Sequence, residues 1–161
     1  MTLEAPTAHR IRVDTTDSEF VSLLVEPNGA FENYYDALTF CASLAAYKKL
    51  APIPVDRAAS KPNPIRLEIF ESNGLDHVIN LLAADATKSV DVLAGTSEAM
   101  SQRIEIFEGL ARAGLQSLRK SVETTTNPLE AVELAIQNAI ASPDGNESEG
   151  LDDILNAPDL A

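Results

Sequence analysis

The stretch SEAMSQRIEIFEGLARAGLQSLRKSV, residues 97–122, decides the fold because its apolar residues recur with the period of an α-helix. One helical face collects Ile104, Phe107, Ala111, Gly114, Leu115, Leu118 and Val122. Outside this face, we expect solvent around the charged residues Glu105, Glu108, Arg112 and Lys120. The stretch therefore predicts one long amphipathic helix that packs along its length against other elements.

Within this stretch, the hexamer RIEIFE at 103–108 nearly repeats RLEIFE at 66–71, which stands 37 positions earlier. A true repeat would carry its hydrophobic pattern over a whole supersecondary unit, and at this offset little else aligns. We interpret the two hexamers as two edges of amphipathic helices, each of which buries its Phe in one core. For 66–71, the alternation of Ile65, Leu67 and Ile69 leaves a strand open as the alternative to a short helix.

Two helices are predicted in the N-terminal part. Thr16 and Glu19 have the spacing of a capping box, which predicts that a helix starts there and continues through Phe20, Leu23 and Leu24. The segment at 30–50 follows with an unusually wide apolar stripe and with Lys48 and Lys49 in its last turn. We expect this second helix to run through the middle of the domain.

Two more helices are predicted on either side of the long one. The first is strongly apolar and contains Leu75, Val78, Ile79, Leu81 and Leu82. The second begins at Asn127-Pro128, where Asn is the cap, Pro occupies the first helical position and Glu130 completes the signal. Its apolar side would hold Leu129, Val132, Ile136 and Ile140.

Together these signals predict an all-α protein: a compact bundle of about five or six helices with a flexible acidic C-terminal tail. The expected divisions are a loosely ordered N-terminal segment at 1–16, a helical domain at 17–142 and the tail at 143–161. The expected core contains Phe31, Leu38, Leu44, Leu81, Leu82, Phe107, Leu115, Leu118, Val132 and Ile136.

The net charge of −13, from 25 acidic and 12 basic residues, argues against direct binding to duplex DNA. Affinity for a phosphate backbone comes largely from counterions released by Lys and Arg, and here the basic residues are mostly scattered singly. The single cysteine, Cys41, cannot form an internal disulfide, which fits a cytoplasmic location. No apolar run approaches the length of a membrane span.

The C-terminal tail, 143–161, holds six acidic residues and no basic one, so it carries −6 and leaves −7 on residues 1–142. Its composition predicts flexibility, but several apolar residues interrupt it at helical spacing. A partner-binding segment has this form, with Leu151, Ile154, Leu155 and Leu160 inserting into a groove and Asp152 and Asp153 meeting basic residues on its rim. A solvated tail and a tail that docks on its own domain remain as alternatives.

Candidate catalytic groups are few. His77 beside Asp76 lacks further ligands for a metal, and Cys41 lies in an apolar stripe, where burial would raise its pKa and make it unreactive. The pairs Glu68 with Glu71 and Glu105 with Glu108 have a spacing that solvated helix faces routinely show. The sequence therefore predicts no enzyme, no cofactor and no metal site, although a hydrolase that uses these groups is kept as a hypothesis.

Three segments in order resemble a known family: FENYYDALTFCASLA, then PIRLEIFESNGLDHVINLLA, then SQRIEIFEGLARAGLQSL. They are similar to the small helical proteins associated with bacterial DNA phosphorothioation (Dnd) operons. The similarity covers about residues 31–118 and leaves the acidic tail outside. It implies a place in a DNA-modification and anti-phage defence system, and it transfers no catalytic residue to this chain.

The resulting hypothesis is a non-catalytic accessory or regulatory subunit of such a system that acts through contacts with its other protein components. The alternative is an acidic DNA mimic that occupies the nucleic-acid site of a partner. A mimic must spread its carboxylates as phosphates are spread, and the central helices carry mixed surfaces instead.

Overall fold

The computed structural model describes residues 9–27, 29–56, 63–123 and 127–141, and within them it confirms an all-α bundle. The described part contains six α-helices, two short 3-10 helices and one sheet of two short strands. The helices are α1 (Ser18–Val25), α2 (Tyr34–Tyr47), α3 (Leu67–Ser72), α4 (Asp76–Thr87), α5 (Ser97–Val122) and α6 (Pro128–Ala141). None of these helices is both long and apolar enough to cross a bilayer.

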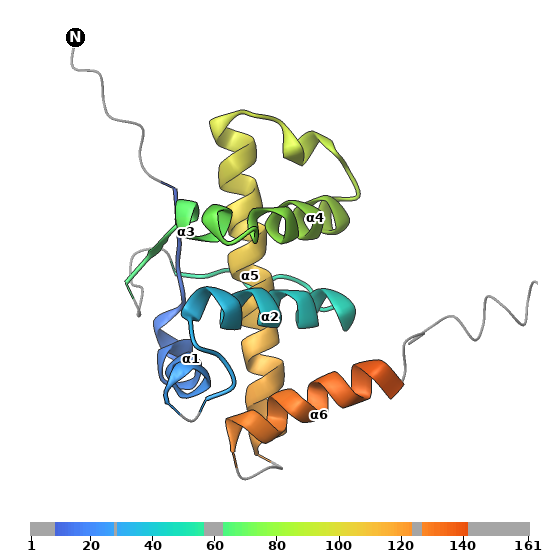
Figure 1. Ribbon diagram of the computed structural model, residues 1–161. Helices are drawn as coiled ribbons and strands as arrows, with labels where there is room; N and C mark the ends of the chain where they lie inside the picture. Colours follow the sequence, from blue (N-terminus) through green and yellow to red (C-terminus); the bar gives the residue numbers. More distant parts are fainter. Residues whose placement is uncertain (1–8, 28, 57–62, 124–126, 142–161) are drawn as a thin grey trace, which may run out of the picture.

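Helix α5 is the long helix that the sequence predicts, and it forms the axis of the molecule. Figure 1 shows α4, α2 and α6 crossing it at successive levels. At the crossing with α2, Gly114 lies so close to Cys41 that a Cβ atom on the glycine would overlap the backbone carbonyl of Cys41. Small residues on α2 also let the two backbones approach, since Ala37, Ala42 and Ala45 are fully buried there.

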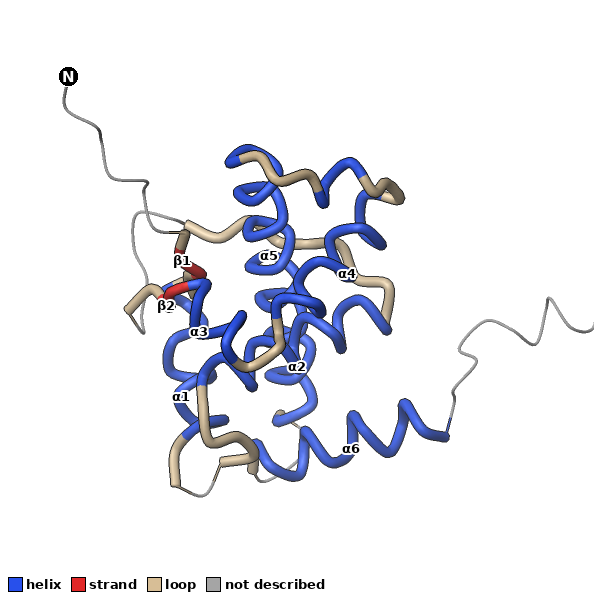
Figure 2. Tube along the Cα trace, turned by 45° about the horizontal axis from the view of Figure 1, so that its top comes forward, coloured by secondary structure: helices blue, strands red, loops and turns tan. Residues whose placement is uncertain are grey.

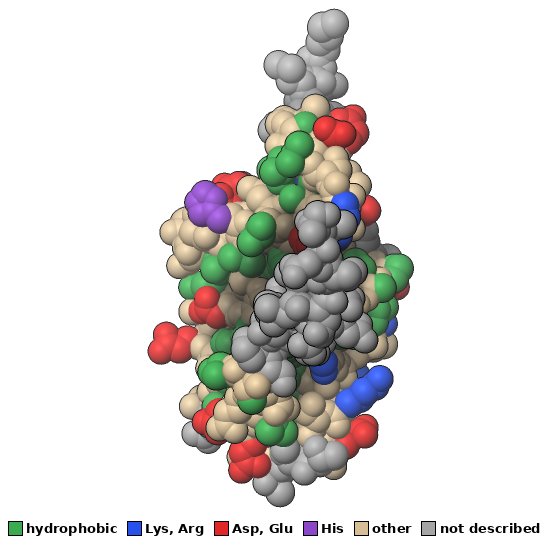
Figure 3. Space-filling view, turned by 90° about the vertical axis from the view of Figure 1, so that its right-hand side faces the viewer, with side chains coloured by type: hydrophobic (Ala, Val, Ile, Leu, Met, Phe, Trp, Pro, Cys, Tyr) green, Lys and Arg blue, Asp and Glu red, His purple; other side chains and the backbone are tan. Residues whose placement is uncertain are grey.

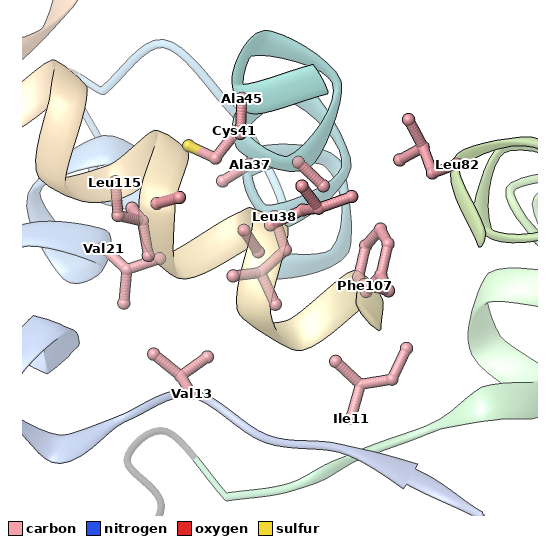
Figure 4. Close-up of a cluster of buried hydrophobic side chains, with 14 of the residues drawn as sticks. Ile11, Val13, Val21, Ala37, Leu38, Cys41, Ala45, Leu82, Phe107 and Leu115 are labelled. Atoms are coloured by element: carbon pink, nitrogen blue, oxygen red, sulfur yellow. The ribbon is translucent and has the colours of Figure 1, made fainter. Parts of the chain in front are cut away.

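The two strands tie the N-terminus to α3. Strand β1 (Arg10–Ile11) pairs antiparallel with β2 (Ile65–Arg66), and the register sets Arg10 against Arg66 (Figure 2). The chain then passes over the core, where Ile11 and Val13 are almost completely buried (Figure 4). The expectation of a loose segment at 1–16 is therefore wrong for its described part, because residues 9–16 contribute a strand and two core side chains.

The hexamer at 66–71 contains both structures that its sequence left open, the end of a strand and a short helix. Arg66 ends strand β2, and α3 begins at the next residue. Phe70 of α3 and Phe107 of α5 are both fully buried, and their rings meet edge to face with centroids 5.6 Å apart. The interpretation that each hexamer buries its Phe in one core is confirmed.

The predicted core is mostly confirmed. Six of its residues are buried, and two more pack against the core while partly buried: these are Leu38, Leu82, Phe107, Leu115, Leu118 and Val132, with Phe31 and Leu44. Leu81 and Ile136 were wrongly assigned to the core, since they are 69% and 43% exposed. The inner face of α4 is formed by Ile79, Leu82 and Ala83, whereas α6 buries only Ala131 and Val132.

One predicted helix cap is wrong and one is confirmed, although the first helix does begin close to the predicted place, at Ser18. Thr16 does not cap α1, because Asp14 accepts hydrogen bonds from the Thr16 backbone at 3.0 Å and from its hydroxyl at 2.7 Å, starting a 3-10 turn at Thr15–Asp17. Asn127 does cap α6, accepting from the Glu130 backbone N–H at 2.8 Å.

Candidate functional site

The residues with catalytic potential do not converge. The side chain of His77 is 84% exposed and lies 4.0 Å from the carboxylate of Asp76. Within the part of the chain that the structure describes, no group of three or more His, Cys, Asp or Glu side chains could hold a metal ion. Cys41 is fully buried, and that burial, with a smaller contribution from the negative charge of Asp17, raises the pKa of its thiol. The structure therefore brings none of these groups to an accessible site.

The two Glu pairs also differ from the expectation. Glu68, Glu71 and Glu105 are exposed, as a solvated helix face would have them. Glu108 is only 2% exposed, so its assignment to the solvent side of α5 is wrong. Its carboxylate accepts a hydrogen bond from the Arg12 backbone N–H at 3.3 Å, because the N-terminal segment covers this side of α5. That carboxylate holds a backbone segment in place.

A cluster of buried charges lies next to Glu108. The guanidinium of Arg112 lies 3.3 Å from Asp14 and 3.4 Å from Asp17, and Arg119 donates to Asp17 at 3.1 Å. The Asp56 backbone N–H donates to the second Asp14 oxygen at 3.1 Å. The basic side chains come from α5, whereas the acidic ones belong to the N-terminal segment, so the cluster locks that segment onto the bundle.

The two carboxylates of the cluster respond to it in opposite directions. Burial raises the pKa of Asp17, and the charges of Arg119 and Arg112 counter that effect only in part. Burial also opposes ionisation of Asp14, but hydrogen bonds from Thr16 and Asp56, with the charge of Arg112, together lower its pKa. The cavity beside these groups measures about 10 Å³. That space admits one water molecule at most, so the cluster has a structural role and no room for a substrate.

A wider hollow lies between α5 and the extended segment at 52–55. Its volume is about 500 Å³, and the charged side chains on its wall are Glu105 and Glu108. The segment is fixed to α5 by a hydrogen bond from the Ile53 N–H to the Gly109 carbonyl, at 3.0 Å. A hollow whose charged groups are carboxylates does not suit phosphate groups.

A groove with apolar walls lies between α2 and α6 and has a volume of about 310 Å³. It is lined by Phe40, Ser43, Leu44 and Tyr47 of α2 and by Ala135, Ile136, Ala139 and Ile140 of α6. The hydroxyl of Tyr47 donates to the Ala139 carbonyl at 3.3 Å, and this hydrogen bond joins the two walls. Ile140 is 73% exposed, and Leu129 and Leu134 of the same helix are exposed as well. We call this concavity the α2–α6 groove.

Basic residues stand at one end of the α2–α6 groove. Lys48 and Lys49 follow directly on Tyr47, and the left-handed backbone of Lys49, with φ of 56°, turns the chain away from α2. Lys48 reaches the hydroxyl of Ser117 on α5 at 2.7 Å. Two basic residues therefore follow directly on the apolar α2 wall of the groove, an arrangement that suits an amphipathic acidic segment.

The sequence predicts two of the lining residues, Leu44 and Ile136, as core and places Ile140 on the apolar side of its helix, but it predicts no groove. The only signal of a groove was that α2 and α6 each carry more apolar surface than one neighbour covers. The predicted tail residues Leu151, Asp152, Asp153, Ile154, Leu155 and Leu160 lie outside the described residues.

One of three comparisons with known proteins identifies the family of this chain. No curated protein and no solved structure matches it. A family model described as DNA sulphur modification system-associated protein 4 matches residues 10–154. The match extends well beyond the three segments that carry the resemblance, and it includes both the N-terminal strand and the first part of the tail. The chain therefore belongs to the family of DNA sulphur modification system-associated protein 4.

Proposed function

We propose that this protein is a non-catalytic accessory or regulatory subunit of a bacterial DNA sulphur modification system, acting in the cytoplasm. In this proposal it binds another protein component of the system through the α2–α6 groove. Family membership supports the link to such a system, and the apolar α2–α6 groove supports the choice of binding surface.

The observation that carries the proposal is the exposed apolar surface of α6. Only two of its residues are buried, whereas Leu129, Leu134, Ile136 and Ile140 are each at least 39% exposed. Of these four, Ile136 and Ile140 line the α2–α6 groove together with Phe40, Leu44 and Tyr47. Apolar residues gathered along a groove are typical of protein–protein contact surfaces, whereas single exposed apolar residues are ordinary. A non-catalytic role also fits the titratable groups, because Glu108 and the charge cluster are engaged in holding the N-terminal segment.

Charge supports contact with protein in preference to DNA. Figure 3 shows one face of the molecule, where acidic side chains stand apart from one another among hydrophobic, uncharged and basic ones. A DNA mimic would need them in a phosphate-like row, and the described residues of this face do not form one. We expect no retention of duplex DNA by the purified protein in a gel-shift assay at physiological salt.

The test is co-purification of the tagged full-length protein with the DNA sulphur modification proteins encoded beside it. The variant Ile136→Glu/Ile140→Glu places two charges in the groove and should lose most of the co-purified component. The control Leu81→Glu/Val90→Glu changes two residues that are 69% and 74% exposed away from the groove, and it should retain the component. Equal retention by both variants would overturn the proposal.

A further inference from the structure

We propose that the C-terminal segment of the chain, residues 151–155, docks into the α2–α6 groove of the same molecule. The docked segment would cover the apolar wall of α6. The inference uses the groove of the proposed function, but docking itself concerns this chain alone.

The position of the groove favours its own tail as the occupant. In Figure 1, α2 and α6 both end on the same side of the molecule, and the chain leaves α6 there. Ile140 lines the groove and precedes Ala141, the last residue of α6. Helix α6 therefore ends two residues after Ala139, whose carbonyl accepts the hydrogen bond from Tyr47 of α2.

The length of the intervening chain permits the return. Nine residues, 142–150, separate α6 from Leu151. They begin with Ser-Pro-Asp-Gly, a combination that favours a chain reversal. Extended, nine residues reach about 30 Å, whereas the part of α6 from Ala135 to Ile140 is only about 8 Å long. A covalent link of this length keeps the segment near the groove at an effective concentration on the order of millimolar.

Chemical complementarity supports the same occupant. Leu151, Ile154 and Leu155 have the i, i+3, i+4 spacing that places them on one face of a helix, which matches a groove with apolar walls. Asp152 and Asp153 lie on other sides of such a helix, and their charge is complementary to that of Lys48 and Lys49, which follow the α2 wall of the groove. The tail has a net charge of −6 and no basic residue, so each of its charged side chains is attracted to Lys48 and Lys49.

The experiment is methyl and amide NMR spectroscopy on full-length protein at two concentrations. It compares the wild type with Ile154→Asp/Leu155→Asp and with the control Asn146→Asp/Ser148→Asp, which adds the same charge to the part of the tail that lacks apolar residues. We expect the methyl signals of Ile136 and Ile140 to shift in the first variant only, while those of Leu81 and Val90 stay in place. Amides 152–156 should exchange about tenfold faster in that variant than in the other two proteins.

Identical Ile136 and Ile140 signals in all three proteins would overturn the inference. So would shifts that grow with protein concentration, which would indicate docking into a second copy, or shifts confined to Leu81 and Val90, which would place the tail elsewhere. Because no partner protein is present, failure here leaves the co-purification result for the groove unaffected. Conversely, loss of the partner-binding role would leave these shifts intact.

Discussion

Helices α5 and α6 use their side chains in opposite ways. In α5, twelve residues are buried, and they include two charged ones, Arg103 and Glu108. In α6, two residues are buried, and large apolar side chains face outward instead. Each buried charge of α5 has an internal partner, since Arg103 donates to the Val92 carbonyl at 2.6 Å and Glu108 accepts from Arg12. The comparison indicates that α5 organises the fold, whereas the described residues leave the outer face of α6 exposed.

The largest effect on the free energy of unfolding is expected from Gly114→Ala at the crossing of α5 and α2. The new Cβ would overlap the Cys41 carbonyl, and a backbone atom can move away only if the helices separate. We expect the free energy of unfolding to fall by about 3 kcal/mol or more, measured by urea denaturation. Gly95→Ala is the matched control, because a Cβ there meets nothing within 4 Å. Equal stability of the two variants would mean that the helices are not in close contact.

A smaller loss is expected from Arg112→Met, which removes one cation from the charge cluster. The Arg112 side chain is 20% exposed and contacts two carboxylates that are almost completely buried. Leaving these carboxylates with fewer partners should lower the free energy of unfolding by about 3 kcal/mol at most. Arg119→Met should cost less, because the Arg119 side chain is 40% exposed. The reverse order in chemical denaturation would refute this description of the cluster.

The pH dependence of stability should be smaller still. Because the folded state raises the pKa of Asp17 above 3.8, its stabilising contribution is complete below that pH and is lost as the pH rises through the folded-state pKa. Asn at position 17 does not titrate, so the variant does not lose this contribution as the pH rises. It also has weaker contacts with Arg112 and Arg119 than Asp17 does. The stability of Asp17→Asn relative to wild type should therefore improve as the pH rises from 4 to 7, as measured by urea denaturation at each pH. A relative stability that declines over this range would contradict the raised pKa.

The smallest effect on stability is expected on α6. Ile140 is 73% exposed, so Ile140→Glu, made in the Ile154→Asp/Leu155→Asp background in which the tail is undocked, should change the free energy of unfolding by no more than about 0.5 kcal/mol. Val132→Ala, on the buried side of the same helix, should cost about 2 kcal/mol. If thermal or chemical denaturation shows that Ile140→Glu is the more damaging of the two, the outer face of α6 belongs to the core.

Features that depend on residues close together in the sequence could be predicted, whereas features that depend on contacts between distant residues could not. Helical periodicity located α5 and most of the core, and the local Asn127 signal located the start of α6, because these depend on neighbours in the sequence. Glu108 and Arg12 are 96 positions apart, so no local pattern indicates that the N-terminal segment covers α5. The α2–α6 groove was hidden for a related reason. Periodicity identifies an apolar face, but it does not say whether another element covers that face.

The most direct measurement of the central claim is hydrogen exchange of the full-length protein, alone and after co-purification with the neighbouring DNA sulphur modification proteins. If the α2–α6 groove is the contact surface, added protection should be concentrated in the second half of α2 and at 135–140 of α6. Amides in the buried part of α5 should change little, because they are already protected by the core. Protection that appears around Leu81, Val90 and Leu93, with none in α2 or α6, would contradict the account.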